Sequence, residues 1–305
     1  MSLEALRPHS VSPAEALVEK TAKPESVNWY VTSICNYKCD FCFFTDRGFR
    51  ASLDKPSPLH LTKEQSMKIL TMLFEAGTKK ITFAGGEPTT YHLLPELIER
   101  AKRLGMTTML VTNGTGLTDS FLDSVTGYLD AVKFSIDSPS NHTEYRMGRG
   151  YGHHVDEALM AAERVEKKGM IIMLNTVVSR LNLDEDMTPI VRKLRPVRWK
   201  VFQILPAMDM NAANWDKLKI TGEEFQSFIE RHSKLMPIVE DNETMADSYV
   251  IIDPIGRFMQ DSGKRHVYST PILEVGVMPA LAQVGWNYLM FLKRGGRYEL
   301  PEHRK

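Results

Sequence analysis

The fold is decided by one stretch, Val27-Asn28-Trp29-Tyr30-Val31-Thr32-Ser33-Ile34-Cys35-Asn36-Tyr37-Lys38-Cys39-Asp40-Phe41-Cys42. Residues 27–32 are rich in β-branched and aromatic side chains, which predicts a strand that ends just before three cysteines. Downstream, similar short apolar runs alternate with helical segments, the pattern of an α/β fold with a parallel sheet. Functional groups in such folds gather at the carboxyl ends of the strands, where these cysteines fall.

The alternation continues along the chain. Five further strands are expected at 80–84, 107–112, 131–136, 171–178 and 199–205. Helices are expected at 62–76, 94–104, 118–129, 155–168, 183–194 and 222–235. The first of these helices carries a capping box, Thr62 with Gln65, and Gly77 closes it. Six βα units are too few for an eight-stranded barrel, so the sequence predicts an open, partial (β/α)6 barrel.

Composition limits the classes of function. The 305 residues include 38 Lys and Arg against 38 Asp and Glu, so binding to DNA or RNA through bulk charge is not expected. The chain contains 3 cysteines, all at 35–42, which excludes a disulfide framework and points to the cytoplasm. A continuous apolar run of about 18 residues is absent from the sequence, so no membrane attachment is expected.

The chain is expected to consist of three segments. Residues 1–25 are expected to form a poorly ordered leader and residues 26–245 the partial barrel. Residues 246–305 break the strand–helix alternation and are expected to form a C-terminal extension that closes the active site and contributes to substrate binding.

Three thiols within eight residues, Cys35, Cys39 and Cys42, can converge on zinc or on an iron–sulfur cluster. Zinc needs a fourth ligand, and the candidates His60 and His92 have no recognisable zinc spacing to the cysteines. The spacing C-x3-C-x2-C, with an aromatic residue before the last cysteine, resembles the radical S-adenosylmethionine superfamily. This resemblance implies a [4Fe–4S] cluster with one iron open to S-adenosylmethionine.

Further residues match by this resemblance. Gly85-Gly86-Glu87-Pro88 resembles the second motif of the superfamily, which binds the methionine amino group. Ser135 and Arg149 would hold the methionine carboxylate, and Asn113 would lie near the nucleoside. Taken alone, each of these residues also has a structural explanation: a strand-to-helix turn for 85–88, and a structural polar residue for Asn113, Ser135 and Arg149.

Phe43 and Phe44 follow the last cysteine. The resemblance implies that their rings line the binding site for the adenine of S-adenosylmethionine. Packing in the core is an equally good account of Phe44.

Several longer segments resemble the viperin family of radical enzymes and its prokaryotic and fungal members. The matching stretches are Cys35-Asn36-Tyr37-Lys38-Cys39, Pro196-Val197-Arg198-Trp199-Lys200-Val201-Phe202-Gln203, Asp247-Ser248-Tyr249, Ile272-Leu273-Glu274-Val275-Gly276-Val277 and Phe291-Leu292-Lys293-Arg294-Gly295-Gly296-Arg297-Tyr298. The resemblance extends over residues 28–298 and implies a lyase that converts a ribonucleoside triphosphate to its 3′-deoxy-3′,4′-didehydro form. A 5′-deoxyadenosyl radical would abstract the 4′ hydrogen, a one-electron reductant would be needed, and family analogy adds an antiviral role.

The expected substrate needs fixed cations. Arg198 and Lys200 alternate on one strand and so point to the same side, with Trp199 on the other. Further candidates lie in the basic turns Lys264-Arg265-His266 and Lys293-Arg294-Gly295-Gly296-Arg297, which are otherwise explained as solvated surface.

Two residues bear on the reaction and the base. Tyr249 is the expected proton donor or relay for the leaving hydroxyl, with a buried core tyrosine as the alternative. Met173-Leu174-Asn175 stands where the animal sequence has lysine, isoleucine and asparagine. Asn175 can read a base or bind ribose, but Met173 cannot bind phosphate, which leaves the base open, with cytidine or uridine triphosphate favoured.

Two other functions remain open from the sequence. A radical enzyme acting on a peptide or another non-nucleotide substrate is one, although many of these carry extra C-terminal cysteines that are absent here. A nucleotide- or metal-binding regulator without turnover is the other. We expect a monomer.

Overall fold

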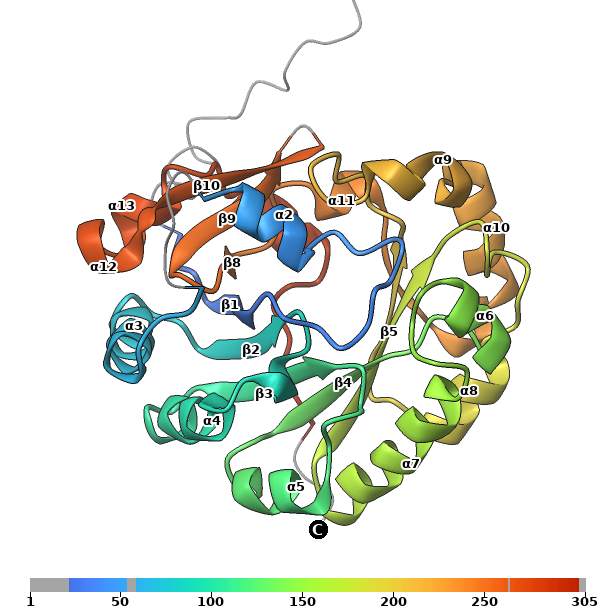
Figure 1. Cartoon of the computed structure of the whole chain (residues 1–305), viewed down its shortest axis with the longest axis horizontal. Coiled ribbons are helices and arrows are strands. Elements are labelled where there is room, and N and C mark those ends of the chain that lie inside the picture. The colour runs from blue at the N-terminus through green and yellow to red at the C-terminus, as the bar shows by residue number, and fades with distance from the viewer. Residues whose placement is uncertain (1–21, 54–58, 263, 302–305) are drawn as a thin grey trace, which may run out of the picture.

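The computed structural model describes residues 22–53, 59–262 and 264–301 (Figure 1). In this part of the chain ten strands join into one sheet, in the order β10-β9-β8-β1-β2-β3-β4-β5-β6-β7. The strands are β1 (Ser26–Thr32), β2 (Lys80–Gly85), β3 (Thr107–Thr112), β4 (Ala131–Ser135), β5 (Ile171–Val178), β6 (Trp199–Gln203), β7 (Ile238–Glu240), β8 (Ile251–Ile252), β9 (Arg257–Ser262) and β10 (Arg265–Pro271). Strands β1 to β6 are parallel and adjacent in chain order, which confirms the expected α/β partial barrel.

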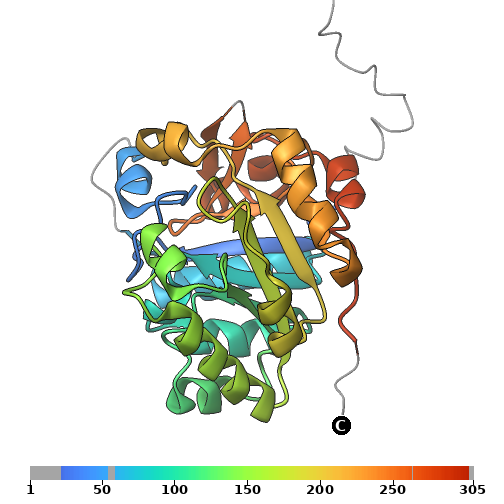
Figure 2. The ribbon, with the colours of Figure 1, turned by 90° about the vertical axis from the view of Figure 1, so that its right-hand side faces the viewer.

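The sheet is extended at both edges. Strand β7 pairs parallel to β6 at one edge, and β8 pairs parallel to β1 at the other. Beyond β8, the strands β9 and β10 form an antiparallel hairpin. Figure 2 shows the strong twist of the sheet, with the blue β1 nearly horizontal and the yellow-green strands standing steeply.

Helices cover the outer side of the parallel strands. Figure 1 shows α3, α4, α5, α7 and α8 arranged around them. The helices are α2 (Asp46–Ala51), α3 (Lys63–Glu75), α4 (Leu94–Arg103), α5 (Asp119–Val125), α6 (Asn141–Arg146), α7 (His154–Lys167), α8 (Thr188–Leu194), α9 (Trp215–Leu218), α10 (Gly222–Arg231), α11 (Asn242–Met245), α12 (Ile272–Val275), α13 (Val277–Leu281) and α14 (Tyr288–Lys293), with 3₁₀ turns at Pro88–Thr90, Ala212–Asn214 and Ser233–Leu235. In this described part of the chain, a helix both long enough and apolar enough to cross a membrane is absent.

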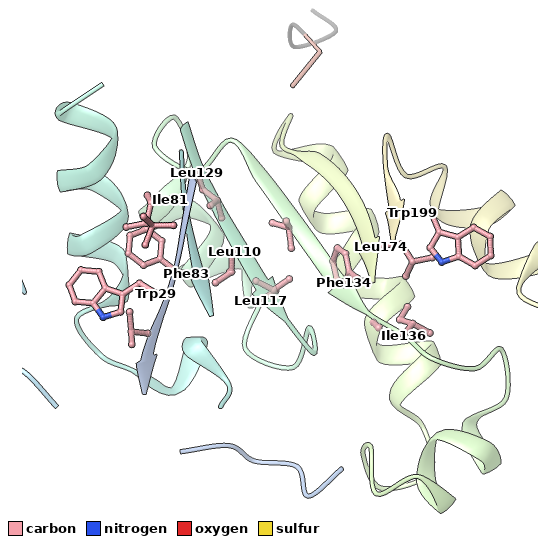
Figure 3. Packing of buried hydrophobic residues seen from close by; sticks show 14 of the residues in the cluster. Trp29, Ile81, Phe83, Leu110, Leu117, Leu129, Phe134, Ile136, Leu174 and Trp199 are labelled. Carbon is pink, nitrogen blue, oxygen red and sulfur yellow. The ribbon is translucent and has the colours of Figure 1, made fainter. Parts of the chain in front are cut away.

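The main core lies between the sheet and these helices. Alternate residues of the parallel strands point outward into it, among them Trp29, Phe83, Phe134 and Trp199 (Figure 3). The intervening residues, for example Lys200 beside Trp199, therefore face the interior of the barrel. Because of this alternation, the side chains on the outer side of each strand form the hydrophobic core, and those on the inner side are available for binding and catalysis.

Several expected elements differ in length. The helix expected at 118–129 ends at Val125, because Thr126 has a ψ of 130° and Gly127 a φ of 83°, and a right-handed helix allows neither. The helix expected at 183–194 begins at Thr188, because Pro189 has no amide hydrogen to bond to the carbonyl of Glu185 and its ring would clash with that carbonyl in a longer helix. The sequence did not predict α2, α6 or β7, each of which has seven residues or fewer.

The two ends of the described chain pack together. Ala22 is buried against Tyr288 and Phe291, and Glu25 forms an ion pair with Arg297. The rest of the expected leader, 1–21, lies outside the described residues. Residues 22–25 thus form part of the folded body with the C-terminal segment.

Candidate active site

The three cysteines lie on the loop after β1, and this loop is bound to the loop after α6. The Lys38 amide donates to the Gly148 carbonyl over 3.2 Å, and the Asp40 amide donates to the Met147 carbonyl over 2.9 Å. Gly148 has a φ of 76°, and a Cβ there would lie 2.2 Å from the Lys38 carbonyl oxygen. Only glycine allows this approach, which places Arg149 next to the cysteines.

Burial raises the pKa of the Cys39 and Cys42 thiols, and partial desolvation raises that of Cys35, which is an exposed residue, to about 11. The positive charge of Arg149 lowers the pKa of Cys39, whereas the negative charges of the Cys42 and Cys35 thiolates raise it. In the described residues, a group of three or more His, Cys, Asp or Glu side chains already arranged around one point is absent, and this applies to the three cysteines as well. Three neighbouring thiols on one loop, beside a fixed cation, fit a cluster with three protein ligands, because a cationic centre offsets the cost of burying thiolates.

Arg149 is buried between two carboxylates that the sequence did not single out. Its Nε donates to Asp137 Oδ2 over 2.8 Å and lies 3.4 Å from Glu144 Oε2. Its guanidinium carbon also lies 5.3 Å from the centre of the Phe41 ring. These contacts fix one orientation of the guanidinium beside the thiols, where it can bind an anionic group.

Glu87 is 2 % exposed, and its carboxylate is already bonded within the protein. One oxygen accepts from the hydroxyls of Thr89 and Thr112, at 2.6 and 2.7 Å, and the other accepts from the Asn113 amide at 2.8 Å. The side chain therefore joins the loop after β2 to the end of β3.

The two glycines before Glu87 allow the same loop to pack on the start of the cysteine loop. A Cβ on Gly85 would lie 2.3 Å from the Thr32 carbonyl oxygen, and one on Gly86 would lie 2.2 Å from that of Ile34. Both glycines are thus required by close backbone contact with the chain that leads into Cys35.

Polar residues predicted for the cofactor lie at the carboxyl ends of β3 and β4, and the predicted substrate residue Asn175 lies in the middle of β5. Asn113 donates from Nδ2 to Asn36 Oδ1 over 2.8 Å, which connects β3 to the cysteine loop. Ser135 on β4 pairs in register with Asn175 on β5, and Asn175 pairs with Lys200 on β6. Three of the predicted polar residues therefore form a row on adjacent strands below the cysteines.

Lys200 belongs to a buried charge network inside the barrel. Its ammonium forms an ion pair with Glu240 and donates to the Tyr249 hydroxyl over 3.2 Å. The Tyr249 hydroxyl donates to Glu240, whose carboxylate also lies 3.6 Å from Arg294. The guanidinium of Arg294 lies 3.6 Å from the Tyr249 ring centre. The sequence predicted Lys200, Tyr249 and Arg294 for this region but missed Glu240, which lies on the short strand β7.

Ionisation in this network follows from burial and charge. Burial lowers the pKa of Lys200 to about 8, although Glu240 opposes the shift. Burial alone would raise the pKa of Glu240, but Lys200 and Arg294 hold it below its usual value. Burial and the Glu240 charge raise the pKa of Tyr249 well above that of free tyrosine. Tyr249 is therefore a protonated phenol at neutral pH.

A floor closes the amino-terminal end of the barrel. The Tyr298 ring centre lies 3.8 Å from both the Lys80 ammonium and the Arg198 guanidinium. Tyr298 packs with Met109 and Met173 on the interior face. The Lys80 ammonium also donates to the Tyr298 carbonyl over 2.5 Å. Arg198 was predicted as a site residue, whereas Lys80 was missed because it stands at the start of an apolar strand.

The β9–β10 hairpin carries the predicted segment 264–266. His266 is buried, with Nδ1 2.9 Å from Asp209 Oδ2, and its ring stacks with that of Phe43 at 6.3 Å. Lys264 and Arg265 are exposed near the tip of the hairpin. Phe43 is partly buried in contact with Tyr30, whereas Phe44 is buried in the same apolar cluster.

Two predicted cations do not join the interior. Lys293 is exposed on α14. Arg297 is exposed and forms an ion pair with Glu25, at the amino-terminal side of the barrel. Of the basic run 293–297, the structure brings only Arg294 to the charge network.

This fold and this cysteine loop define a class of proteins. A family description, "Radical SAM superfamily", matches residues 29–194. Two solved structures are similar in fold: Streptococcus suis SuiB bound to S-adenosylmethionine (TM-score 0.66, 14 % identity, 90 % of this chain and 70 % of that chain), and anSMEcpe with bound AdoMet and the Kp18Cys peptide (TM-score 0.64, 15 % identity, 88 % and 83 %). The chain is thus a member of the Radical SAM superfamily.

Proteins of similar sequence identify one family within this superfamily. The S-adenosylmethionine-dependent nucleotide dehydratase of Flammeovirga pacifica is 40 % identical over 278 residues, which cover 90 % of this chain and 95 % of that protein. The protein of the same description from Oncorhynchus mykiss is 35 % identical, over 92 % of this chain and 82 % of that protein. The chain belongs to the family of S-adenosylmethionine-dependent nucleotide dehydratases.

Proposed function

We propose that this protein removes the 3′-hydroxyl of a ribonucleoside triphosphate, giving the 3′-deoxy-3′,4′-didehydro nucleotide, with a [4Fe–4S] cluster and S-adenosylmethionine as cofactors. The observation that carries the proposal is a cationic barrel interior below the cysteine loop. Among the described interior residues, four cations, Lys133, Arg198, Lys200 and Arg294, interact with one carboxylate, Glu240. Lys80 adds a fifth cation, which interacts with Lys133 and Arg198. The excess of positive charge suits a triphosphate, which carries about four negative charges.

Cofactor binding is assigned to the upper part of this site. Cys35, Cys39 and Cys42 would hold the cluster, and Arg149 with Ser135 would bind the methionine carboxylate. The loop Gly85-Gly86-Glu87 would lie against the methionine amino group, with Asn113 and Phe43 near the nucleoside. When bound, these cofactors supply a 5′-deoxyadenosyl radical that removes the hydrogen atom from C4′ of the ribose.

The protein's own residues then act on the leaving group. Tyr249 donates its proton to the 3′-hydroxyl, which leaves as water when the C3′–O bond breaks. One electron from an external reductant completes the C3′–C4′ double bond. Lys200, whose ammonium bonds to the Tyr249 oxygen, returns a proton to the phenolate, and Glu240 holds both groups in place.

The substrate extends below the reacting ribose. Arg198, Lys200 and Arg294 bind phosphate, and Asn175 contacts the ribose or a pyrimidine base, with cytidine and uridine triphosphates preferred. Residues 246–301 act as an extension that completes the site of the 26–245 barrel, because they contribute Tyr249, Arg294 and the floor residue Tyr298. His266, Lys264 and Arg265 border the site from the hairpin.

The test is anaerobic reconstitution with iron and sulfide, followed by assay of 5′-deoxyadenosine with each of the four ribonucleoside triphosphates. We expect release that depends on a pyrimidine triphosphate, together with a nucleotide product that has lost water. Cys39→Ala should lower iron content and abolish release, whereas Lys38→Ala, in the same loop and exposed, should leave both unchanged. Release of 5′-deoxyadenosine that does not depend on any nucleotide would favour a non-nucleotide substrate. Absence of 5′-deoxyadenosine release would favour a regulator without turnover.

A further inference from the structure

Lys133 is one of the buried interior cations, and the mechanism above assigns it no contact of its own with the substrate. It lies in the middle of β4, between Val132 and Phe134, which are both 0 % exposed. The lysine points to the opposite, interior side, and its ammonium donates to Thr82 Oγ1 on β2 over 3.1 Å. Among the described residues, that hydroxyl is its one hydrogen-bonding partner, and no carboxylate forms an ion pair with it.

The surroundings of Lys133 repel a cation. Arg198 and Arg294 both act to displace its proton, and Glu240 is the carboxylate that opposes them. Glu240 is already engaged by Lys200 and Tyr249. A buried ammonium without a carboxylate partner costs free energy. Without an anionic ligand beside it, Lys133 therefore lowers the stability of the folded protein.

The position of Lys133 along the barrel identifies the part of a ligand that it can reach. The cysteines and Ser135 lie at the carboxyl ends of the strands, and Lys133 is two residues deeper on β4 than Ser135. Arg198 is level with Lys133 across β5, because Met173 is the register partner of Lys133 and precedes the Leu174–Trp199 pair. Lys80 lies deeper, and the floor residue Tyr298 contacts both Lys80 and Arg198. A nucleotide whose ribose lies below the cysteines therefore directs the end of its phosphate chain toward Lys133.

We propose that Lys133 binds the terminal phosphate of the substrate and makes the site select triphosphates over diphosphates. This inference rests on the proposed function, since it assumes a nucleotide oriented with its ribose toward the cysteines. An anionic phosphate supplies the counter-charge that Lys133 lacks. Charge-assisted hydrogen bonds to phosphate are among the stronger polar contacts in proteins.

The sheet register offers a sharp test, because Lys133 on β4 is the direct partner of Met173 on β5. Lys133→Met removes the ammonium, and the double variant Lys133→Met with Met173→Lys moves it to the adjacent strand at the same level. Lys68→Met, on the exposed face of α3, is the matched control. Calorimetric titration of the cofactor-free protein with cytidine and uridine tri- and diphosphates, and with inorganic tripolyphosphate, measures binding without turnover.

We expect Lys133→Met to weaken triphosphate binding about 10- to 100-fold, to leave diphosphate binding nearly unchanged, and the double variant to recover much of the loss. The melting temperature without ligand should not fall, because a buried charge has been removed. Triphosphate binding equal to that of the control, or an equal loss for di- and triphosphates, would overturn the assignment. Lys133-dependent binding of tripolyphosphate without nucleotide-dependent 5′-deoxyadenosine release would instead contradict the proposed function and leave the anion site standing.

Discussion

The Tyr249 hydroxyl donates a hydrogen bond to Glu240, although the two residues belong to opposite flanks of the sheet. Glu240 ends β7, and Tyr249 lies just before β8, with the strands β1 to β6 between them in the sheet order. The sheet is therefore curved enough for its two flanks to meet across the interior. A side-chain contact closes the barrel where the described strands leave a gap in backbone pairing.

Replacement of Tyr249 by phenylalanine should separate radical formation from dehydration. Without the phenolic proton the 3′-hydroxyl leaves slowly, so dehydrated nucleotide should fall about 10²- to 10⁴-fold while 5′-deoxyadenosine is still released. Chromatography of both products from one reaction measures the ratio. Tyr128→Phe, on the outer surface beside Arg103, is the control, and an unchanged ratio in Tyr249→Phe would remove this residue from the reaction.

Replacement of Glu240 by glutamine should destabilise the protein. The change removes the negative charge that Lys200 and Arg294 share in a fully buried position. We expect the free energy of unfolding to fall by about 3–5 kcal/mol, measured by urea denaturation of the cofactor-free protein. Saturating tripolyphosphate should restore part of this loss, and a decrease no greater than that of the exposed Glu243→Gln would contradict the prediction.

Lys133 predicts a pH dependence of stability with a defined sign. Burial, with repulsion from Arg198 and Arg294, lowers its pKa to about 7, whereas an unfolded lysine titrates near about 10.4. Between these values the unfolded chain binds more protons, so titration of Lys133 makes the folded state more stable as pH rises. The free energy of unfolding of the ligand-free protein, minus that of Lys133→Met, should therefore increase from about pH 7 to about pH 10. A flat or falling difference in urea denaturation would show that Lys133 keeps an ordinary pKa.

Gly148 should be more sensitive to substitution than Gly152. Both glycines have positive φ, 76° and 99°, but a Cβ on Gly148 would collide with the Lys38 carbonyl, whereas nothing lies within 4 Å of one on Gly152. Gly152→Ala thus reports backbone strain alone, about 1–3 kcal/mol of unfolding free energy. Gly148→Ala should cost more and also lower the iron bound after reconstitution, because it separates Arg149 from the cysteine loop. Equal iron content in the two variants would refute this link.

The parallel strands of the core could be predicted from the sequence, because each of them is a short apolar run followed by a polar or turn residue. Gly85 and Asn113 were expected where their strands end, and Ser135 within the strand 131–136. In the structure Gly85 and Ser135 are the last residues of β2 and β4, and Asn113 directly follows β3. Helix lengths were harder to predict, since Gly127 and Pro189 act locally within longer amphipathic stretches.

The charged interior could be predicted only in part. Lys133 stands in an apolar strand, and only the assembled sheet shows that its side of the strand encloses a polar space. Glu240 was missed because β7 has three residues, too few for a period to appear. Neighbours in sequence also separate in space: Arg294 turns inward from the end of α14, while Arg297 reaches Glu25.

The floor residue Tyr298 has a consequence for biosynthesis. It is translated after every strand of the described sheet, yet it contacts Lys80, which begins the second of them. A nascent chain that has completed its sheet on the ribosome would still expose Lys80 and Arg198 at an open lower end. Nucleotide binding of full strength should therefore arise only after the segment around Tyr298 has left the exit tunnel, later than the completion of the sheet itself.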